Sequence, residues 1–166
     1  MMGSGKSTVG PLVAQRLGLD FADTDQMVEA ATAMRLPALW AIDGGTTFRL
    51  AEAAAVAAVA FEPAGTVIAA GGGAVLDSAS IDLMRGSGIV VWLTVEPEVA
   101  AARVGDDTDR PLLSDSLEGS VVGRLAAILE ERRDRYEAAA HHRVATDDNS
   151  ADEVAGSVEA LWPAAT

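Results

Sequence analysis

The sequence contains no cysteine, a single lysine and few aromatic residues. The absence of cysteine excludes disulfide bonds, thiolate metal sites and a cysteine nucleophile together. Long apolar runs are also missing: none could span a bilayer, and no signal-peptide pattern is seen. We therefore expect a cytoplasmic protein with no membrane partner.

Positive charge is scarce as well. Acidic residues outnumber basic ones by 25 to 12, which gives a formal net charge of −13 and an isoelectric point near 4.3. This excess argues against nucleic acid or an anionic membrane surface as a partner, so an anionic ligand would need a local cluster of arginines. The chain has 166 residues, of which 49% are hydrophobic. We expect one domain, residues 1–166, with a proper hydrophobic core.

The only lysine, Lys6, lies in the opening stretch "MMGSGKST". This stretch matches the end of the phosphate-loop pattern G-x-x-x-x-G-K-[ST]. A compact ammonium group fits between the β- and γ-phosphates of a nucleotide, where a planar guanidinium is too bulky. The alternative is a chance lysine in a glycine- and serine-rich segment. The hydrophobic helix pattern that follows favours the phosphate loop.

The opening glycine of this pattern would lie one position ahead of Met1, and the strand that normally precedes the loop would lie ahead of that glycine. In a P-loop kinase this strand is central, so its loss would expose two sheet edges and part of the core. We therefore expect protein made from Met1 to be poorly soluble and inactive. A form extended upstream by roughly ten residues, one strand and its lead-in, should fold cooperatively and be active.

Hydrophobic periodicity predicts alternating helices and strands along the rest of the chain. Strands are predicted in "LDFADTD", "GTVIAAGGG", "GIVVWLTV" and "HRVAT", and helices from the loop to Gly18 and at about 26–34, 37–42, 46–60, 120–140 and 151–162. The stretch "GIVVWLTV" shows no alternation of polar and apolar residues, as in parallel sheets covered on both sides. The fold prediction is a three-layer α/β domain with a central parallel sheet. The polar segment at about 105–117 is predicted to be a lid loop.

An acidic pair, Asp23 and Asp25, follows the first predicted strand. Both side chains lie on one side of an extended chain, just beyond the strand end where parallel α/β sheets bind ligands. One carboxylate could orient the waters of Mg²⁺, and the other could take a proton from an acceptor hydroxyl. The alternative is an acidic turn or helix N-cap. The position after a phosphate-loop helix favours the ligand site.

Six motifs, taken in their order along the chain, resemble those of the shikimate kinase family: "GSGKST", "DTD", "FR" after "DG", "GGG", "RPLL" and an arginine four residues before a tyrosine. Each is weak alone, but together they are specific, and they extend from Gly3 to about Thr146. The resemblance implies a P-loop fold shared with nucleoside monophosphate kinases, with substrate-binding helices at about 25–61. It implies transfer of the γ-phosphoryl group of ATP, with Mg²⁺, to the 3-hydroxyl of shikimate in aromatic amino-acid biosynthesis. We expect ATP and shikimate as partners and a monomer.

On the nucleotide side, the resemblance assigns catalytic or binding roles to the loop, to two acidic residues and to two arginines. The phosphate loop would be Gly3, Ser4, Gly5, Lys6, Ser7 and Thr8, with Lys6 catalytic and the Ser7 hydroxyl on Mg²⁺. Asp23 would be the outer metal carboxylate, Arg103 would lie on the adenine, and Arg110 would be the catalytic lid arginine over the phosphates.

On the substrate side, the resemblance implies that Asp25 holds the shikimate hydroxyls and acts as the base, while Arg49 and Arg132 grip the carboxylate. Planar, permanently charged arginines orient a small anion better than lysines do. Gly72 and Gly73 would approach the ring, since glycines at a strand end let backbone and ligand come close.

Alternatives remain for each of these residues. Arg49 could be solvated on its helix, and "EERRDR" is typical of an exposed charged face, so the choice of Arg132 rests on its spacing to Tyr136. His141 and His142 are given no role. The rival functions are another small-molecule kinase of the same fold, such as a gluconate kinase, and a non-catalytic nucleotide-binding remnant. A GTPase is disfavoured because the sequence has no N-K-x-D motif.

Overall fold

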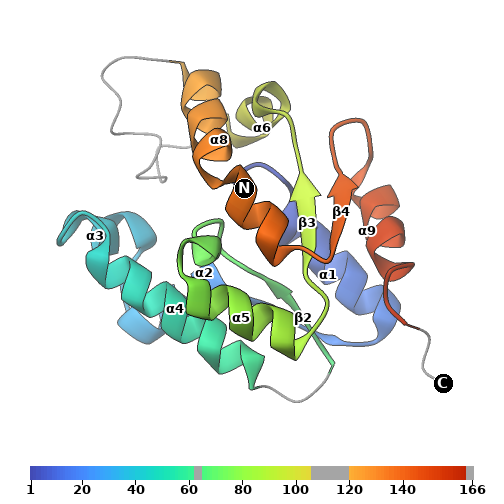
Figure 1. Ribbon diagram of the computed structural model, residues 1–166, viewed down its shortest axis with the longest axis horizontal. Helices are drawn as coiled ribbons and strands as arrows, with labels where there is room; N and C mark the ends of the chain where they lie inside the picture. Colours follow the sequence, from blue (N-terminus) through green and yellow to red (C-terminus); the bar gives the residue numbers. More distant parts are fainter. Residues whose placement is uncertain (62–64, 106–119, 164–166) are drawn as a thin grey trace.

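The computed structural model describes residues 1–61, 65–105 and 120–163, and it forms an α/β domain (Figure 1). Arg110 and nearly all of the predicted lid lie outside the described residues. Within the described part of the chain, no helix is both long and apolar enough to cross a membrane.

The strands pair in parallel, as the sequence predicts. Strand β1 (Asp20–Asp23) pairs with β2 (Thr66–Ala69), and β3 (Val91–Thr94) pairs with β4 (His142–Ala145). The sequence predicts one central sheet. The described residues instead form two parallel pairs, because none of their strands lies between β2 and β3. The carboxyl ends of both pairs lie near Met1, which contacts Gly72 and shares a hydrophobic cluster with Val95.

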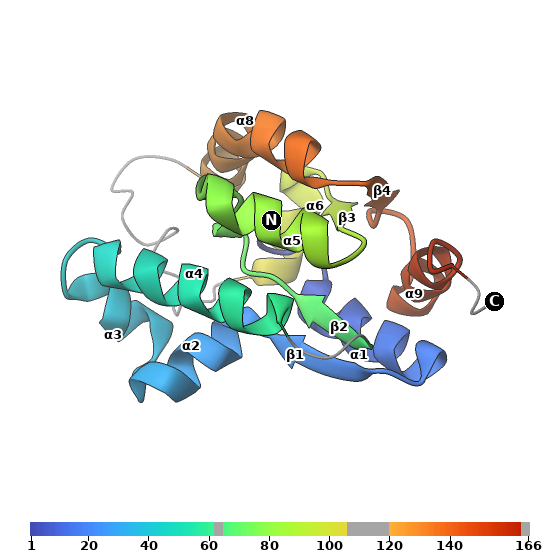
Figure 2. The same cartoon turned by 60° about the horizontal axis from the view of Figure 1, so that its bottom comes forward.

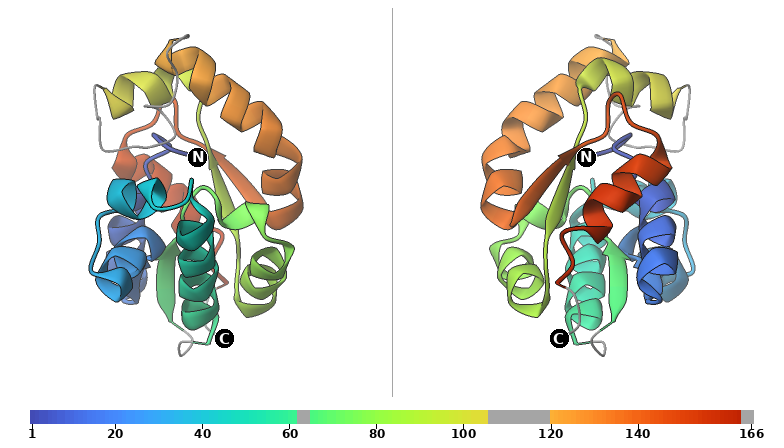
Figure 3. Two further views of the ribbon diagram at one scale, coloured as in Figure 1. Left: turned by 90° about the vertical axis from the view of Figure 1, so that its left-hand side faces the viewer. Right: turned by 90° about the vertical axis from the view of Figure 1, so that its right-hand side faces the viewer.

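Helices cover both faces of the strands, giving three layers (Figure 3). Helices α1 (Lys6–Leu17) and α9 (Ala151–Glu159) lie on one face, and α5 (Ser78–Ser87) and α8 (Val121–Ala139) lie on the other. The first face is closed by a cluster that includes Val9, Val13 and Val154 around Leu93. On the second face Trp92 of β3 stacks on Tyr136 of α8, with ring centroids 5.4 Å apart. Tyr136 of α8 and Met1, just before the phosphate loop, both lie against Gly72, beyond the end of β2.

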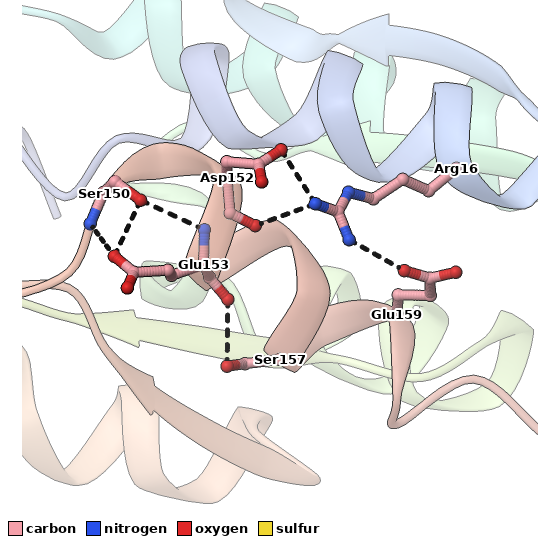
Figure 4. Close-up of polar contacts among 6 residues, drawn as sticks. All are labelled: Arg16, Ser150, Asp152, Glu153, Ser157 and Glu159. Carbon is pink, nitrogen blue, oxygen red and sulfur yellow. Dashed lines mark hydrogen bonds and ion pairs between the residues drawn. The ribbon is translucent and has the colours of Figure 1, made fainter.

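Polar contacts fix α9 against α1 (Figure 4). The Arg16 guanidinium donates to the Asp152 carboxylate at 2.7 Å and to Glu159 at 3.0 Å. Ser150 and Glu153 form a capping box that satisfies the first N–H groups of α9. Exposed ion pairs contribute little to stability, so the apolar cluster holds the helices together and Arg16 sets their register.

Helices α2 (Thr24–Thr32), α3 (Leu36–Ala41) and α4 (Thr46–Ala60) form a group to one side of the strands (Figure 2). They have a core of their own, built from Val28, Leu39, Phe48 and Ala55. The group occupies almost the same range, 25–61, for which substrate binding is predicted.

Most predicted elements are found within a few residues of their expected bounds, and α4 matches its prediction. Helices α5 and α6 (Pro97–Val104) were not predicted from the sequence. Both are short, and the large apolar residues of α5 are Ile81, Leu83 and Met84 alone. Helix α9 ends at Glu159 rather than near Trp162. A short 3₁₀ helix, η1 (Ala74–Leu76), follows the glycine triplet and leads into α5.

Candidate active site

The phosphate loop is shaped by two glycines with left-handed backbones. Gly3 has a φ of 72°, and a side chain there would stand 2.7 Å from the Ala100 carbonyl oxygen, so only glycine fits. Gly5, with a φ of 85°, is the N-cap of α1 and provides no capping side chain. The N–H groups of the first helical turn are therefore left to an anion, which is the arrangement that binds phosphate at helix N-termini.

Two side chains of the loop close it on its own main chain. The Ser4 hydroxyl, fully buried, donates to the Met1 carbonyl oxygen at 2.9 Å, and the Lys6 ammonium donates to the same oxygen at 2.8 Å. Ser7 and Thr8, by contrast, are exposed at the start of α1. The loop thus holds its lysine and the Ser4 hydroxyl inward, and it presents Ser7 and Thr8 outward.

A hydroxyl and a carboxylate meet where the predicted metal site lies. Ser7 Oγ donates to Asp23 Oδ2 at 2.8 Å, and Asp23 Oδ1 accepts from the Asp25 N–H at 2.9 Å. Asp23 therefore caps α2, as its alternative interpretation expects, and also faces the phosphate loop. No group of three metal-binding side chains occurs in the described ranges. One hydroxyl and one carboxylate suit Mg²⁺, which is usually held by one or two protein oxygens together with phosphates and water.

The glycine triplet after β2 is surrounded by charged side chains. A side chain at Gly71 would stand 2.7 Å from Asp25 Oδ1 and 2.6 Å from Glu52 Oε1. At Gly73 it would collide with the Arg49 guanidinium, which is itself paired with Glu52. The triplet therefore consists of glycines because two carboxylates and a guanidinium lie against its backbone.

Arg132 reaches the same triplet from α8. It is 6% exposed, and its Nη1 donates to the Gly72 carbonyl oxygen at 3.3 Å. The Tyr136 hydroxyl, one helical turn later, donates to the same oxygen at 2.7 Å. Among the described residues, the Arg132 Nε atom is a buried donor without a hydrogen-bond partner. Arg49 thus lies against Gly73 and Arg132 against Gly72, although the two arginines come from helices far apart in sequence.

The neighbouring arginines of "EERRDR" do not reach the triplet. Arg133 pairs with Glu130 on the surface, and Arg135 donates to the Leu76 carbonyl oxygen at 2.8 Å, at the end of η1. The exposed-face interpretation is therefore right for Arg133 and wrong for Arg132. A cavity of about 230 Å³ borders Arg49, Glu52 and Gly73, so the arginine side of the triplet is open to a small molecule.

Two residues of this cluster were not predicted. Glu52 follows Arg49 by three residues on α4, a spacing that places two side chains on one helical face and could have indicated the pair. Thr24, fully buried between the two aspartates, accepts a hydrogen bond from the Gly71 N–H at 2.8 Å through its Oγ1. No sequence signal reveals that contact, since it joins segments that meet only in the fold.

Burial raises the pKa of the Glu52 carboxyl above its ordinary value of 4.5, although Arg49 acts in the opposite direction. Above pH 4.5 the unfolded chain loses this proton while the folded chain still holds it. Stability should therefore fall as the pH rises from 4.5 towards the folded pKa, by up to about 1.4 kcal/mol per pH unit. In Glu52→Gln this fall should disappear. Urea unfolding across this pH range checks it, with exposed Glu131→Gln as the control, and an unchanged profile in Glu52→Gln would contradict the prediction.

Arg103 and His141 lie at the margins of the site. The Arg103 guanidinium donates to the Gly3 carbonyl oxygen at 3.3 Å and to Thr146 Oγ1 at 2.9 Å, which ties α6 to the phosphate loop. Its predicted place on the adenine stays a prediction. His141 Nδ1 accepts from the Val90 N–H at 3.0 Å, a contact that anchors the start of β3.

A glycine-bounded loop at a helix N-terminus, with a lysine, a hydroxyl and a carboxylate beside it at the carboxyl ends of parallel strands, defines a P-loop kinase. The shikimate kinase family model matches residues 2–161. The chain belongs to the shikimate kinase family. It is 42% identical over 160 residues to a shikimate kinase of Symbiobacterium thermophilum, covering 95% of this chain and 90% of that protein. With a shikimate kinase of Moorella thermoacetica it shares 44% identity over 158 residues, covering 95% and 88%.

A solved structure also matches. The shikimate kinase from Acinetobacter baumannii, determined in complex with shikimate, aligns with a TM-score of 0.90 at 30% identity, over 96% of this chain and 87% of that one. The family prediction and the P-loop kinase fold made from the sequence are thereby confirmed.

Proposed function

We propose that this chain transfers the γ-phosphoryl group of ATP to the 3-hydroxyl of shikimate. The observation that carries the proposal is the meeting of Arg49 and Arg132 on the glycine triplet, beside Asp25 and next to the phosphate loop. The Acinetobacter baumannii relative, whose structure contains shikimate, supports the same acceptor.

The two arginines orient the acceptor by its carboxylate. Within the described part of the chain, the buried Arg132 Nε has no hydrogen-bond partner, which suits an anionic oxygen, and Arg49 faces the cavity beside Gly73. Asp25 lies across the triplet, with its Oδ1 close to Gly71. A ring held by its carboxylate at one end can thus present a hydroxyl to Asp25, which accepts the proton as the oxygen attacks phosphorus.

The phosphate loop provides the other half of the reaction. The N–H groups at the start of α1 hold the phosphate oxygens, and Lys6 neutralises the charge that develops on the transferred group. Mg²⁺ would be held by the Ser7 hydroxyl and, through water, by Asp23, and it would supply positive charge that offsets the negative charge of the phosphates. Arg110 lies outside the described residues, and its role over the phosphates stays a prediction.

The metal assignment can be tested at Asp23. Asp23→Asn keeps the cap of α2 but weakens the pull on water ligands, so the Mg²⁺ concentration for half-maximal activity should rise by roughly 10–100-fold. Titration of activity with Mg²⁺ at saturating ATP measures this rise. Asp43→Asn is the control, because Asp43 is exposed and its carboxylate accepts hydrogen bonds from Thr47, in the first turn of α4. An unchanged Mg²⁺ requirement in Asp23→Asn would remove Asp23 from the metal site.

The acceptor is tested by ADP release with shikimate, with gluconate and with no acceptor. Release that depends on shikimate supports the proposal. Release that depends on gluconate alone would favour the gluconate kinase rival, and ATP binding without transfer to any acceptor would favour the remnant.

A further inference from the structure

The Gly72 carbonyl oxygen accepts two hydrogen bonds from one helix, α8. The Tyr136 hydroxyl donates to it at 2.7 Å, and Arg132 Nη1 donates to it at 3.3 Å. The first distance is ordinary for a hydroxyl donor, whereas the second is longer than the usual range for an N–H donor. The tyrosine therefore fixes where this oxygen lies, and the arginine bonds to an oxygen that is already held.

Tyr136 itself is held on its ring. The ring stacks on Trp92 of β3, with centroids 5.4 Å apart and an angle of 21° between the planes. Tyr136 belongs to the buried hydrophobic cluster that includes Leu125 and Ala139 of the same helix. The Arg143 guanidinium also lies over the Trp92 ring, 5.2 Å from its centroid. The hydroxyl thus stands at the end of an aromatic stack that joins α8 to β3.

Burial keeps this hydroxyl protonated. It raises the pKa of Tyr136 above its ordinary value of 10.0, although the nearby charge of Arg132 acts in the opposite direction. At neutral pH the phenol therefore has one proton to donate, and it donates that proton to Gly72. Buried phenols commonly find such a partner, so this contact alone does not separate a structural role from a functional one. The state of Arg132 does.

Arg132 needs a fixed anchor if it is to bind an anion in one geometry. A free arginine side chain has many rotamers, whose loss costs up to about 2 kcal/mol. Arg132 is buried with its Nη1 on the Gly72 oxygen, and over the ranges that the structure describes its Nε has no hydrogen-bond partner. Because the guanidinium is planar, an anchor at Nη1 limits the directions in which the Nε–H can point. Whatever holds the Gly72 oxygen therefore also directs this unpaired donor.

We propose that Tyr136 is a positioning residue for substrate binding, which holds the Gly72 carbonyl oxygen so that Arg132 presents its Nε–H to the carboxylate of the acceptor. This inference rests on the proposed function, in which Arg132 grips the shikimate carboxylate. Tyr136 acts through Arg132 and not on the reacting atoms. Its effect should be equal in the ground state and the transition state, since the carboxylate lies at the other end of the ring from the reacting hydroxyl.

Tyr136→Phe tests the proposal, because it removes the hydroxyl and keeps the ring on Trp92. The KM of shikimate should rise by roughly 3–10-fold, the effect of one hydrogen bond, while kcat and the KM of ATP stay within about twofold. The melting temperature should fall by no more than about 4 °C. Steady-state kinetics and thermal melts of the same samples measure these quantities. An unchanged shikimate KM, or a loss confined to kcat, would overturn the proposal.

Two further variants separate positioning from a general loss of stability. Ile128→Val truncates a buried side chain of the same helix, at a typical cost of about 0.5–1.5 kcal/mol, and changes no polar group. It should leave the shikimate KM unchanged, and an equal rise there would assign the effect to stability instead. Arg132→Lys keeps a cation but has no planar fork to direct. In that background Tyr136→Phe should change shikimate affinity by less than about twofold, whereas additive losses would show that Tyr136 does not act through Arg132.

An arm without substrate separates this inference from the proposed function. Exchange of the Arg132 Nε–H with solvent is followed by NMR, with the signal identified by its absence in Arg132→Lys, and it reports how firmly the guanidinium is held. Exchange should be slow in the unchanged protein and clearly faster in Tyr136→Phe. Faster exchange in a protein that releases no ADP with shikimate would support the positioning of Arg132 and contradict the proposed function alone. Equal exchange in both proteins would overturn the positioning role, whichever acceptor is used.

Discussion

Replacing Lys6 with alanine is expected to reduce phosphoryl transfer by roughly 10³-fold while shikimate affinity stays largely intact, because only the nucleotide side of the site loses charge. Lys6→Arg should restore little of the activity. A guanidinium is planar and larger, so it cannot take the place of a compact ammonium between the phosphates. Steady-state kinetics with calorimetric titration of shikimate measures both quantities.

The structure provides a matched control for this prediction. Lys6 and Ser4 donate to the same carbonyl oxygen of Met1, at 2.8 and 2.9 Å. Ser4→Ala therefore removes a comparable hydrogen bond of the loop without removing a charge. If the loss of activity in Lys6→Ala came from a disordered loop, Ser4→Ala would lose a similar amount. Near-normal turnover in either Lys6 variant would exclude the lysine from catalysis.

The site was largely predictable from sequence where it depends on local pattern. The phosphate loop, the acidic pair and the glycine triplet are short motifs whose backbone requirements appear directly in residue type, and the loop glycines show the positive φ values that such a loop needs. Helix α4 was predicted with its bounds because a long alanine-rich run leaves little choice. In contrast, α5 and α6 are short and have little periodicity of their own. Their positions depend on the connection between strands to which each belongs.

The contacts between distant segments were not predictable in the same way. The Thr24 hydroxyl meets the Gly71 N–H only because β1 and β2 end side by side. The burial of Arg132 within a highly charged stretch likewise follows from the packing of α8 on the strands. Sequence pattern favours a solvated surface there, and Tyr136 was the only marker of which arginine turns inward.

The carboxylate clamp gives the second large expected effect. Arg49→Ala and Arg132→Ala should each weaken shikimate binding by roughly 2–5 kcal/mol, because a partly buried anion loses a charged partner. ATP binding should change little in both. Arg133→Ala is the control on the same helix, since Arg133 pairs with Glu130 at the surface. A larger loss in Arg133→Ala than in Arg132→Ala would show that the assignment along α8 is wrong.

A volume-conserving variant separates binding from stability at this position. Arg132 is buried, its Nε has no hydrogen-bond partner among the described residues, and it lies near the Met1 amino group. Without a ligand, this guanidinium costs the fold the desolvation of an incompletely paired charge. Arg132→Met fills the space of the stem without the charge. This variant should therefore lose shikimate affinity as Arg132→Ala does. Without ligand, it should melt at a higher temperature than the unchanged protein. Such a trade-off between stability and binding is expected of a residue whose role is to bind the ligand. Calorimetric titration and thermal melts of the same samples measure both, and a lower melting temperature together with unchanged shikimate affinity would show that Arg132 serves the fold instead.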